Sequence, residues 1–258
     1  MATVKKGQFV WYEHLTKDAP KAIGFYSDVV GWKTQPFQEG GGDYTMWVGS
    51  QGPLGGVMKL PAEAEKMGAP PHWEAHVQVD DVDATAAQAK KLGGKVYKEP
   101  EDIPNVGRFA VLADPQGAVF CVFKPKEAMT AHDISKEGEF CWNELLTSDR
   151  EAAFRFYSQL FGWQILQQMD MGPAGTYLVF GVGDLRLGGM MTAPKGANMP
   201  PMWLFYAETK DLDAALQRAQ KKGAKLMNGP MDVPGGGRIA QLMDAQGAAF
   251  ALHQAPKK

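Results

Sequence analysis

The 258-residue sequence predicts an α+β protein with two homologous domains, each made of two βαβββ modules. The first observation is a repeat in which Trp11–Asp18 returns as Trp142–Asp149, where residues 11 and 142 differ by 131. The second is that Trp73–Asp83 returns as Trp203–Asp213, where residues 73 and 203 differ by 130. Internal repeats fix an architecture before any local pattern does. We therefore expect domains over residues 1–126 and 136–258.

The first module has the order strand, helix and three strands. Residues 8–15 are rich in β-branched and aromatic side chains, which favours a strand. Asp18 and Pro20 are typical of a helix start, and Gly31 of its end. Ala22, Ile23, Tyr26, Val29 and Val30 would share one helix face. Glycine turns then separate expected strands over residues 32–37, 44–49 and 54–60.

The second module repeats this order. A strand is expected over residues 72–79 and a helix over 81–92, ended by Gly93. Further strands are expected over residues 95–98, 108–112 and 118–123, with Asp114–Gly117 as the turn before the last one. The repeat predicts the same elements in the second half, which gives four modules and open mixed-sheet barrels.

Composition narrows the function classes. Hydrophobic residues make up 45% of the chain, charged residues 22%, and the net charge is −2. The sequence has no basic run with interleaved aromatic residues, so nucleic acid is not an expected partner. No apolar stretch approaches the roughly 20 residues that a membrane-spanning helix needs. Two cysteines define no disulfide framework, and the first residues do not read as a secretory signal. We expect a cytoplasmic protein with a small-molecule ligand, as a monomer or a homodimer.

Several motifs resemble a known group of proteins. Trp-x-Glu-x-x-Thr-x-Asp, followed by Phe25-Tyr26-Ser27 and Gly31-Trp32, is similar to the opening of glyoxalase-like members of the vicinal oxygen chelate superfamily. Residues 79–84 and 108–117 carry further similarity. The superfamily includes lactoylglutathione lyase, bleomycin-resistance proteins and extradiol dioxygenases. The resemblance covers nearly the whole chain and implies paired modules curled into a cup that holds the ligand.

The resemblance also implies metal ligands on the first and last strands of each module. Counted from the motifs, these positions hold Trp11, Gly56, Glu74 and Cys121 in the first domain, and Trp142, Gly189, Leu204 and Ala251 in the second. The four-ligand metal site of the metal-dependent family members is therefore not expected in this chain. Glu74 and Cys121 stay as secondary metal candidates, and a divalent metal ion is a possible cofactor.

Residues two positions further along a strand point the same way. The shifted set is Glu13, Met58, His76 and Phe123, then Glu144, Met191, Tyr206 and His253. Glu13, His76, Glu144 and His253 are thus the main metal candidates. Pairing of modules within a domain would join Glu13 with His76 and Glu144 with His253, whereas crossed pairing would join Glu13 with His253 and Glu144 with His76.

Glu13 and Glu144 are the expected catalytic residues, because each repeats an acidic group inside an apolar strand. Such a carboxylate is costly unless it is paired or useful. It is either a general base or a buried group bonded to backbone or to a neighbouring hydroxyl.

Expected ligand-binding residues include aromatic and methionine side chains, which suit a flat apolar ligand, and two arginines, which suit an anionic one or pair with surface carboxylates. They are Trp11, Trp142, Tyr206, Met58, Met191, Arg108 and Arg238.

The expected function is that of a glyoxalase-like enzyme acting on a small oxygenated or aldehyde-type molecule by proton transfer, with detoxification as the expected context. The alternative is a non-catalytic protein that sequesters a small molecule, as bleomycin-resistance proteins do. Whether the protein is an enzyme is left open by the sequence.

Overall fold

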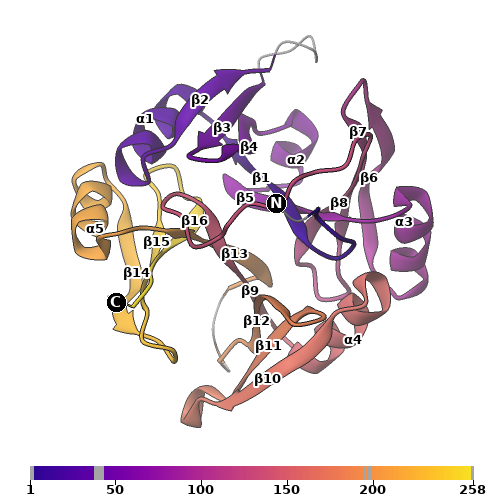
Figure 1. Ribbon diagram of the computed structural model, residues 1–258. Helices are drawn as coiled ribbons and strands as arrows, with labels where there is room; N and C mark the ends of the chain where they lie inside the picture. The colour runs from indigo at the N-terminus through magenta and orange to yellow at the C-terminus, as the bar shows by residue number, and fades with distance from the viewer. Residues whose placement is uncertain (1–2, 38–43, 195, 197–198, 257–258) are drawn as a thin grey trace. The chain divides into compact units, whose positions relative to one another are not determined.

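The computed structural model describes residues 3–37, 44–194, 196 and 199–256 (Figure 1). The first half forms an eight-stranded sheet in the order β2-β3-β4-β1-β5-β8-β7-β6. Its elements are β1 (Phe9–Thr16), α1 (Ala19–Val29), β2 (Lys33–Pro36), β3 (Thr45–Gly49), β4 (Gly52–Lys59), α2 (Ala62–Lys66), β5 (His72–Gln78), α3 (Val82–Lys91), β6 (Lys95–Ile103), β7 (Gly107–Ala113) and β8 (Val119–Pro125).

The second half repeats this plan with the order β10-β11-β12-β9-β13-β16-β15-β14. Its elements are β9 (Phe140–Thr147), α4 (Arg150–Phe161), β10 (Gln164–Asp170), η1 (Gly172–Ala174), β11 (Thr176–Val182), β12 (Leu185–Thr192), β13 (Met202–Glu208), α5 (Leu212–Lys221), β14 (Lys225–Asp232), β15 (Arg238–Met243) and β16 (Ala249–Gln254).

Both sheets are mixed, which confirms the α+β prediction with two homologous halves. β1 pairs with β4 in parallel, as β5 does with β8, while β3–β4 and β7–β8 are antiparallel. β1 and β5 are neighbours in the first sheet, and β9 and β13 in the second. Each sheet therefore joins modules of the same half.

The helices begin where the aspartates predict. Asp18, Asp81, Asp149 and Asp211 precede α1, α3, α4 and α5, and each side chain accepts a hydrogen bond from the backbone N–H three residues on. These bonds satisfy donors that the first helical turn leaves unpaired. The structure adds one helix and lengthens one strand. The stretch after Leu60 contains the short helix α2, and β6 extends to Ile103 instead of ending at Lys98.

The chain divides into two compact units, and each draws on both halves. One unit contains residues 1–10, 75–131 and 142–203, and the other residues 11–74, 132–141 and 204–258. In the first unit α3 packs against α4, and in the second α1 packs against α5 (Figure 1). The sheets thus pair modules within a half, while the compact units pair modules across the halves. The expected boundaries at residues 126 and 136 stay a prediction.

Each unit has its own aromatic core. In the first unit the Trp163 ring stacks on Phe180 with ring centres 4.3 Å apart, and Phe120 lies against Tyr157. In the second unit Tyr26 and Trp32 stack with ring centres 5.7 Å apart, and Phe140 lies against Trp73. Burial of such rings supplies much of the free energy that stabilises a fold.

A turn aspartate anchors each core. Asp244 Oδ1 accepts the N–H groups of Gln246 and Ala248, and its Oδ2 accepts the Tyr26 hydroxyl at 3.0 Å. Trp73 Nε1 in turn donates to Tyr26 Oη. Asp114 has the same role beside Tyr157 and Trp203 in the other unit. The prediction that both aspartates form turns is confirmed, and their bonds to core tyrosines are an addition to it.

Candidate functional site

A Trp–Tyr–Glu group lies on β1 and next to β3. Trp11 Nε1 donates to Tyr44 Oη at 2.7 Å, and Tyr44 Oη donates to Glu13 Oε1 at 2.5 Å. Trp11 and Glu13 are half-buried, while Tyr12 and His14 between and after them are buried. This alternation places Trp11 and Glu13 on one face of the strand. We call Trp11, Tyr44 and Glu13 the first Trp–Tyr–Glu group.

The second half contains the same arrangement on β9 and β11. Trp142 Nε1 donates to Tyr177 Oη at 2.8 Å, and Tyr177 Oη donates to Glu144 Oε2 at 2.8 Å. Trp142 and Glu144 are also half-buried and share a strand face. We call these three residues the second Trp–Tyr–Glu group. Its recurrence shows that both repeats build one constellation around the predicted catalytic glutamates.

The tyrosines in these groups keep their protons. Burial raises the pKa of the Tyr44 hydroxyl far above its ordinary value, and the nearby Glu13 carboxylate raises it further. Burial and Glu144 act in the same way on the pKa of Tyr177. Each phenol therefore serves as a hydrogen-bond donor at neutral pH. Each carboxylate is held in a fixed direction by a neutral partner.

Two glycines make room for the tyrosines. Gly56 lies opposite Glu13 on β4, and Gly189 lies opposite Glu144 on β12. A Cβ atom at Gly56 would collide with the Tyr44 hydroxyl, and one at Gly189 with the Tyr177 ring. These glycines occupy two positions at which the resemblance implies metal ligands. The space of a ligand side chain is thus filled by a tyrosine from the next strand.

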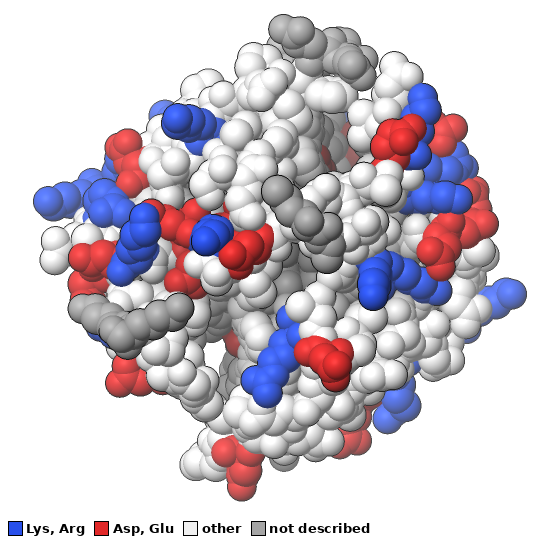
Figure 2. Space-filling model, in the orientation of Figure 1, with Lys and Arg blue, Asp and Glu red and all other residues white. Residues whose placement is uncertain are grey.

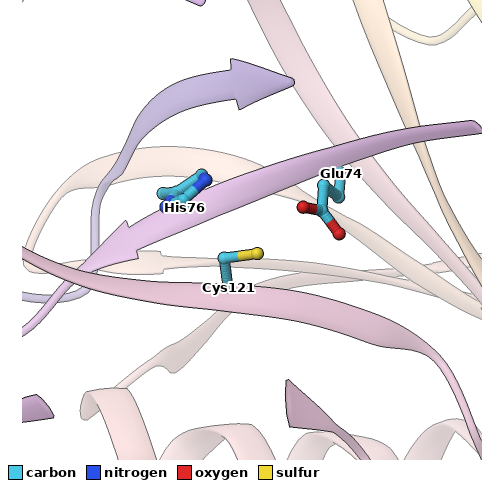
Figure 3. A group of neighbouring side chains, drawn as sticks. All are labelled: Glu74, His76 and Cys121. Carbon is cyan, nitrogen blue, oxygen red and sulfur yellow. The ribbon is translucent and has the colours of Figure 1, made fainter. Parts of the chain in front are cut away.

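A different set of donors meets on β5 and β8. Glu74 and His76 lie two residues apart on β5, and His76 is the parallel partner of Cys121 on β8. Their ligand atoms all lie within 4.8 Å of one another, and all three residues are buried. Figure 3 shows the Cys121 sulfur pointing to the side of the strand where the Glu74 carboxylate lies. We call these residues the β5 cluster.

His72 lies at the edge of this cluster. Its Nε2 atom is 3.8 Å from Glu74 Oε2. Burial lowers the pKa of His72, but the Glu74 carboxylate outweighs burial and leaves that pKa above its ordinary value. The Glu74 carboxylate therefore favours the protonated form of His72.

A second set of donors lies on β9, β13 and β16. The ligand atoms of Cys141, Glu208 and His253 also lie within 4.8 Å of one another. We call these residues the β13 cluster. Among the described parts of the chain, neither cluster includes Glu13 or Glu144. The four main metal candidates are therefore spread over four different groups, and His253 meets Glu208 and Cys141 instead of a partner that the sequence suggested.

The other predicted ligand-binding residues have varied surroundings. Met58 and Met191 are half-buried, and Tyr206 is buried and accepts a hydrogen bond from Gln241 Nε2 at 2.6 Å. Arg108 binds Asp83 and Asp102, and Arg238 binds Asp213.

Arg238 also lines a polar surface pocket of about 330 Å³, together with Lys210, Asp211 and Asp213. No residue of this pocket belongs to a Trp–Tyr–Glu group. Both arginines are thus engaged by carboxylates, and their role with a ligand stays a prediction.

Four residues of these groups were missed by sequence reasoning: Tyr44, Tyr177, Glu208 and Cys141. A signal for the tyrosines exists, because Tyr44 precedes Gly56 by the same interval by which Tyr177 precedes Gly189. Repeated spacing to a repeated glycine suggests a side chain that fills the glycine's space. No such signal exists for Cys141 and Glu208, whose counterparts in the first half are Val10 and Gln78.

The surface carries both signs of charge. On the face shown in Figure 2, basic and acidic side chains are interspersed, and neither sign forms a continuous field. Among the described residues, no helix is long and apolar enough to cross a membrane. The surface on this face offers no extended basic patch of the kind that binds a phosphate backbone.

Comparison with known proteins gives the family context. Residues 11–123 match the model of a glyoxalase-like domain. Residues 141–252 match the model of the glyoxalase/bleomycin resistance protein/dioxygenase superfamily. Among curated proteins, "Putative glyoxylase CFP32" of Mycobacterium tuberculosis is 32% identical, with 98% of this chain and 97% of that protein covered. Anthracycline biosynthesis protein DnrV of Streptomyces peucetius is 29% identical over 98% of this chain and 94% of its own length.

Solved structures share the fold at low identity. The Mn(II)-bound glyoxalase from Novosphingobium aromaticivorans has a TM-score of 0.66 at 14% identity, covering 99% of this chain and 84% of that one. Homoprotocatechuate 2,3-dioxygenase from Brevibacterium fuscum, complexed with 3,4-dihydroxyphenylacetate, has a TM-score of 0.67 at 14% identity, covering 99% and 82%. With two tandem domain matches and a curated relative along the whole chain, the protein belongs to the glyoxalase/bleomycin resistance protein/dioxygenase superfamily.

Proposed function

We propose that this protein is an enzyme that transfers a proton on a small oxygenated or aldehyde-type molecule, with Glu13 or Glu144 as the base. The observation that carries the proposal is the Trp–Tyr–Glu group, which recurs in both halves around a half-buried carboxylate. Unlike the buried turn aspartates Asp114 and Asp244, Glu13 and Glu144 are half-buried, so a ligand can reach their carboxylates. The putative glyoxylase relative is consistent with this reaction class.

The proposed step needs only groups present in the chain. The glutamate carboxylate takes the proton from a carbon next to a substrate carbonyl, and the electron pair of the broken C–H bond forms an enolate. As the glutamate takes up the substrate proton, the tyrosine O–H that it accepted can turn and donate its hydrogen bond to the developing oxyanion instead. In an α-hydroxycarbonyl substrate, the hydroxyl proton passes from the second oxygen of the enediolate to the first, and the protonated glutamate returns its proton to the former carbonyl carbon. The result is an isomerisation without a net change in oxidation state.

The two halves differ in their fit to a metal ion. In the first half, the β5 cluster offers a carboxylate, an imidazole and a thiol within 4.8 Å, a donor set that suits a divalent ion. Glu74, His76 and Cys121 would hold it, and it would polarise a substrate oxygen as a Lewis acid. In the second half, Leu204, Tyr206 and Ala251 stand at the corresponding positions, and none of them is a carboxylate, an imidazole or a thiol. The proton step there depends on Glu144 and Tyr177.

A second candidate function is sequestration of a small aromatic molecule. Trp11 and Trp142 are half-buried, and each indole N–H is fixed by a tyrosine, so both rings are rigidly held. A rigid indole is a good stacking platform for a flat ligand. The relative DnrV, whose printed name places it in anthracycline biosynthesis, is consistent with an organic small-molecule ligand.

Deuterium exchange separates the two functions. The protein is incubated in deuterated water with a panel of small α-hydroxyaldehydes and α-hydroxyketones, and NMR follows loss of the proton next to the carbonyl. We expect catalysed exchange that falls about 10²- to 10⁴-fold when the base is removed in E13Q or E144Q, or in both together. Glutamine keeps the size of the side chain and can still accept the tyrosine hydrogen bond.

The matched control is E137Q, which changes an exposed glutamate. Exchange that persists in the E13Q/E144Q double variant would rule out both bases. Saturable binding of a panel compound without exchange would favour sequestration, provided the thermal melts show that the variants are folded.

A further inference from the structure

We propose that Cys141, Glu208 and His253 form a binding site for a borderline-soft divalent cation such as zinc, separate from the positions at which the family resemblance implies a metal. The three residues come from β9, β13 and β16, which are neighbours in the order of the second sheet. Glu208 and His253 are directly paired in the parallel register of β13 and β16. All three residues lie in the same compact unit.

The donor atoms converge on one point. Cys141 Sγ, a Glu208 carboxylate oxygen and a His253 ring nitrogen all lie within 4.8 Å of one another. Atoms bound to one tetrahedral zinc ion, at about 2.0–2.3 Å from it, are separated by about 3.3–3.8 Å. The observed spread therefore needs only small side-chain movements to close around an ion.

Hydrogen bonds connect the three residues to one another and to the backbone. The Ala255 N–H donates to Glu208 Oε1 at 2.9 Å, and His253 Nδ1 lies 2.5 Å from Glu208 Oε2. The Cys141 thiol donates to the Tyr206 carbonyl oxygen at 3.4 Å. A metal-binding carboxylate is usually held by an outer hydrogen bond of the kind that Ala255 gives Glu208. The Glu208–His253 contact and the thiol hydrogen bond would be replaced by bonds to the ion.

A glycine on the facing loop seats the histidine. A Cβ atom at Gly237 would lie 2.6 Å from His253 Nε2, so an alanine there would push the imidazole. The His253 side chain is about one-quarter exposed, at 24%, whereas Glu208 is buried. Solvent can therefore reach the imidazole side of the β13 cluster, which leaves a route for an ion and a position for a fourth ligand.

The chemistry of the donors suits zinc. Cysteine binds a divalent cation as its thiolate, and histidine as its neutral imidazole. Binding of the cation would replace the thiol proton by a sulfur–metal bond and release that proton. Thiolate and carboxylate then carry two negative charges that balance a divalent ion, and imidazole completes three protein ligands with one open position.

The β13 cluster occurs in the second half alone. The residues of the first half that correspond to Cys141, Glu208 and His253 are Val10, Gln78 and Phe123. Leu204 and Ala251, at the positions where the resemblance implies a metal, do not belong to the cluster. The site is therefore a feature of this half and does not follow from the repeated architecture.

Cobalt(II) spectroscopy tests the proposal because the chain has two cysteines, one in each cluster. Cobalt(II) replaces zinc and gives a thiolate-to-metal charge-transfer band in the near ultraviolet. The test compares the full-length protein with C121A, C141V and the double variant, which carry the residues of the opposite repeat. We expect C121A to bind one equivalent of cobalt with the band, and the double variant to lose it.

The site would be refuted by absence of the band in C121A, or by an undiminished band in the double variant. Thermal melts without metal show whether each variant is folded. The proposal requires the band only in C121A, so it can still be tested if C141V is unstable. A second comparison leaves both cysteines intact. G237A should weaken cobalt binding at least about tenfold, whereas G24A, at an exposed helix position with open space, should leave it unchanged. Equal affinities for the two variants would contradict the seat proposed for His253.

Discussion

At the scale of single residues, the tyrosines decide what the repeated glutamates can do. Glu13 and Glu144 lie in strands whose other residues are mostly apolar, and a carboxylate there needs a partner. Tyr44 and Tyr177 supply it, and each also accepts the indole N–H of a tryptophan. The sequence left open whether such a glutamate is a base or is bonded to a hydroxyl. The structure shows the hydroxyl, and a hydroxyl that orients a carboxylate is compatible with both roles.

Removal of the Tyr44 hydroxyl should destabilise the protein. Y44F takes a donor from Glu13 and an acceptor from Trp11 in one step. We expect the free energy of unfolding to fall by about 1–3 kcal/mol, because two polar groups away from bulk water lose their partner. Urea denaturation at neutral pH measures this. Y97F, at a tyrosine that is 47% exposed, is the matched control and should change the free energy by less than about 0.5 kcal/mol. Equal effects of Y44F and Y97F would show that the hydrogen bonds of the first Trp–Tyr–Glu group do not contribute to stability.

The buried His14 differs between the repeats, because its counterpart is Leu145. The ring is fully buried, stacks on Trp73, and places Nε2 3.4 Å from Asp244 Oδ2. Burial lowers the pKa of His14 and outweighs the Asp244 carboxylate, which raises it. The charges of Asp244 and His72 and the hydroxyl of Tyr26 face this ring. His14 is therefore neutral in the folded protein at neutral pH.

Acid should destabilise the protein through His14. The unfolded chain takes up a proton near the ordinary pKa of 6.5, while the folded protein resists it. The free energy of unfolding should thus fall by up to about 1.4 kcal/mol per pH unit as the pH drops below that value. H14L should reduce this slope without loss of stability at neutral pH, as measured by urea denaturation over pH 5 to 8. An unchanged slope in H14L would assign the acid sensitivity to other groups.

At the scale of elements, close packing between strands fixes where the tyrosines lie. Gly56 on β4 and Gly189 on β12 each lie beside a tyrosine from the adjacent strand. The helices contribute differently, since all four modules begin their main helix with a capping aspartate. The caps position the helices, and the glycines position the Trp–Tyr–Glu groups.

Alanine at Gly56 should displace Tyr44. The new methyl group would collide with the phenol hydroxyl, and overpacking of this kind costs about 1–3 kcal/mol of stability. We expect G56A and G189A to lower the melting temperature and to reduce any proton exchange that depends on the neighbouring glutamate. G24A, in α1, should instead keep or slightly raise the melting temperature, because alanine favours a helix. A stable G56A with normal exchange would show that Tyr44 is dispensable.

At the scale of the whole molecule, sheets and compact units divide the chain differently. Each sheet uses one half, but each compact unit takes one module from each half. The bonds from Tyr157 to Asp114 and from Tyr26 to Asp244 lie inside the units and join distant parts of the sequence. Each aromatic core is thus assembled from both halves of the chain.

The halves should therefore not fold well alone. We expect residues 1–126 and 136–258, produced separately, to show weak near-ultraviolet circular dichroism and low melting temperatures, because each exposes apolar surface that the other half covers. Mixing the two should restore a cooperative transition. The matched control is the full chain cleaved within residues 127–135, which should stay associated. Stable, independently folded halves would show that the boundaries expected from the repeat also define autonomous folding units.

The sequence alone determined the fold class, the order of elements and the helix starts, since these depend on local pattern and on the internal repeat. It also marked Glu13 and Glu144, because a repeated charge in an apolar strand stands out without coordinates. It did not show Tyr44, Tyr177 or the β13 cluster, whose members come from strands far apart in sequence. Only the structure showed that the two modules of one half share a sheet, whereas each aromatic core combines one module from each half. Sheet pairing and side-chain packing depend on distances between strands, and a sequence records the order of residues and not those distances.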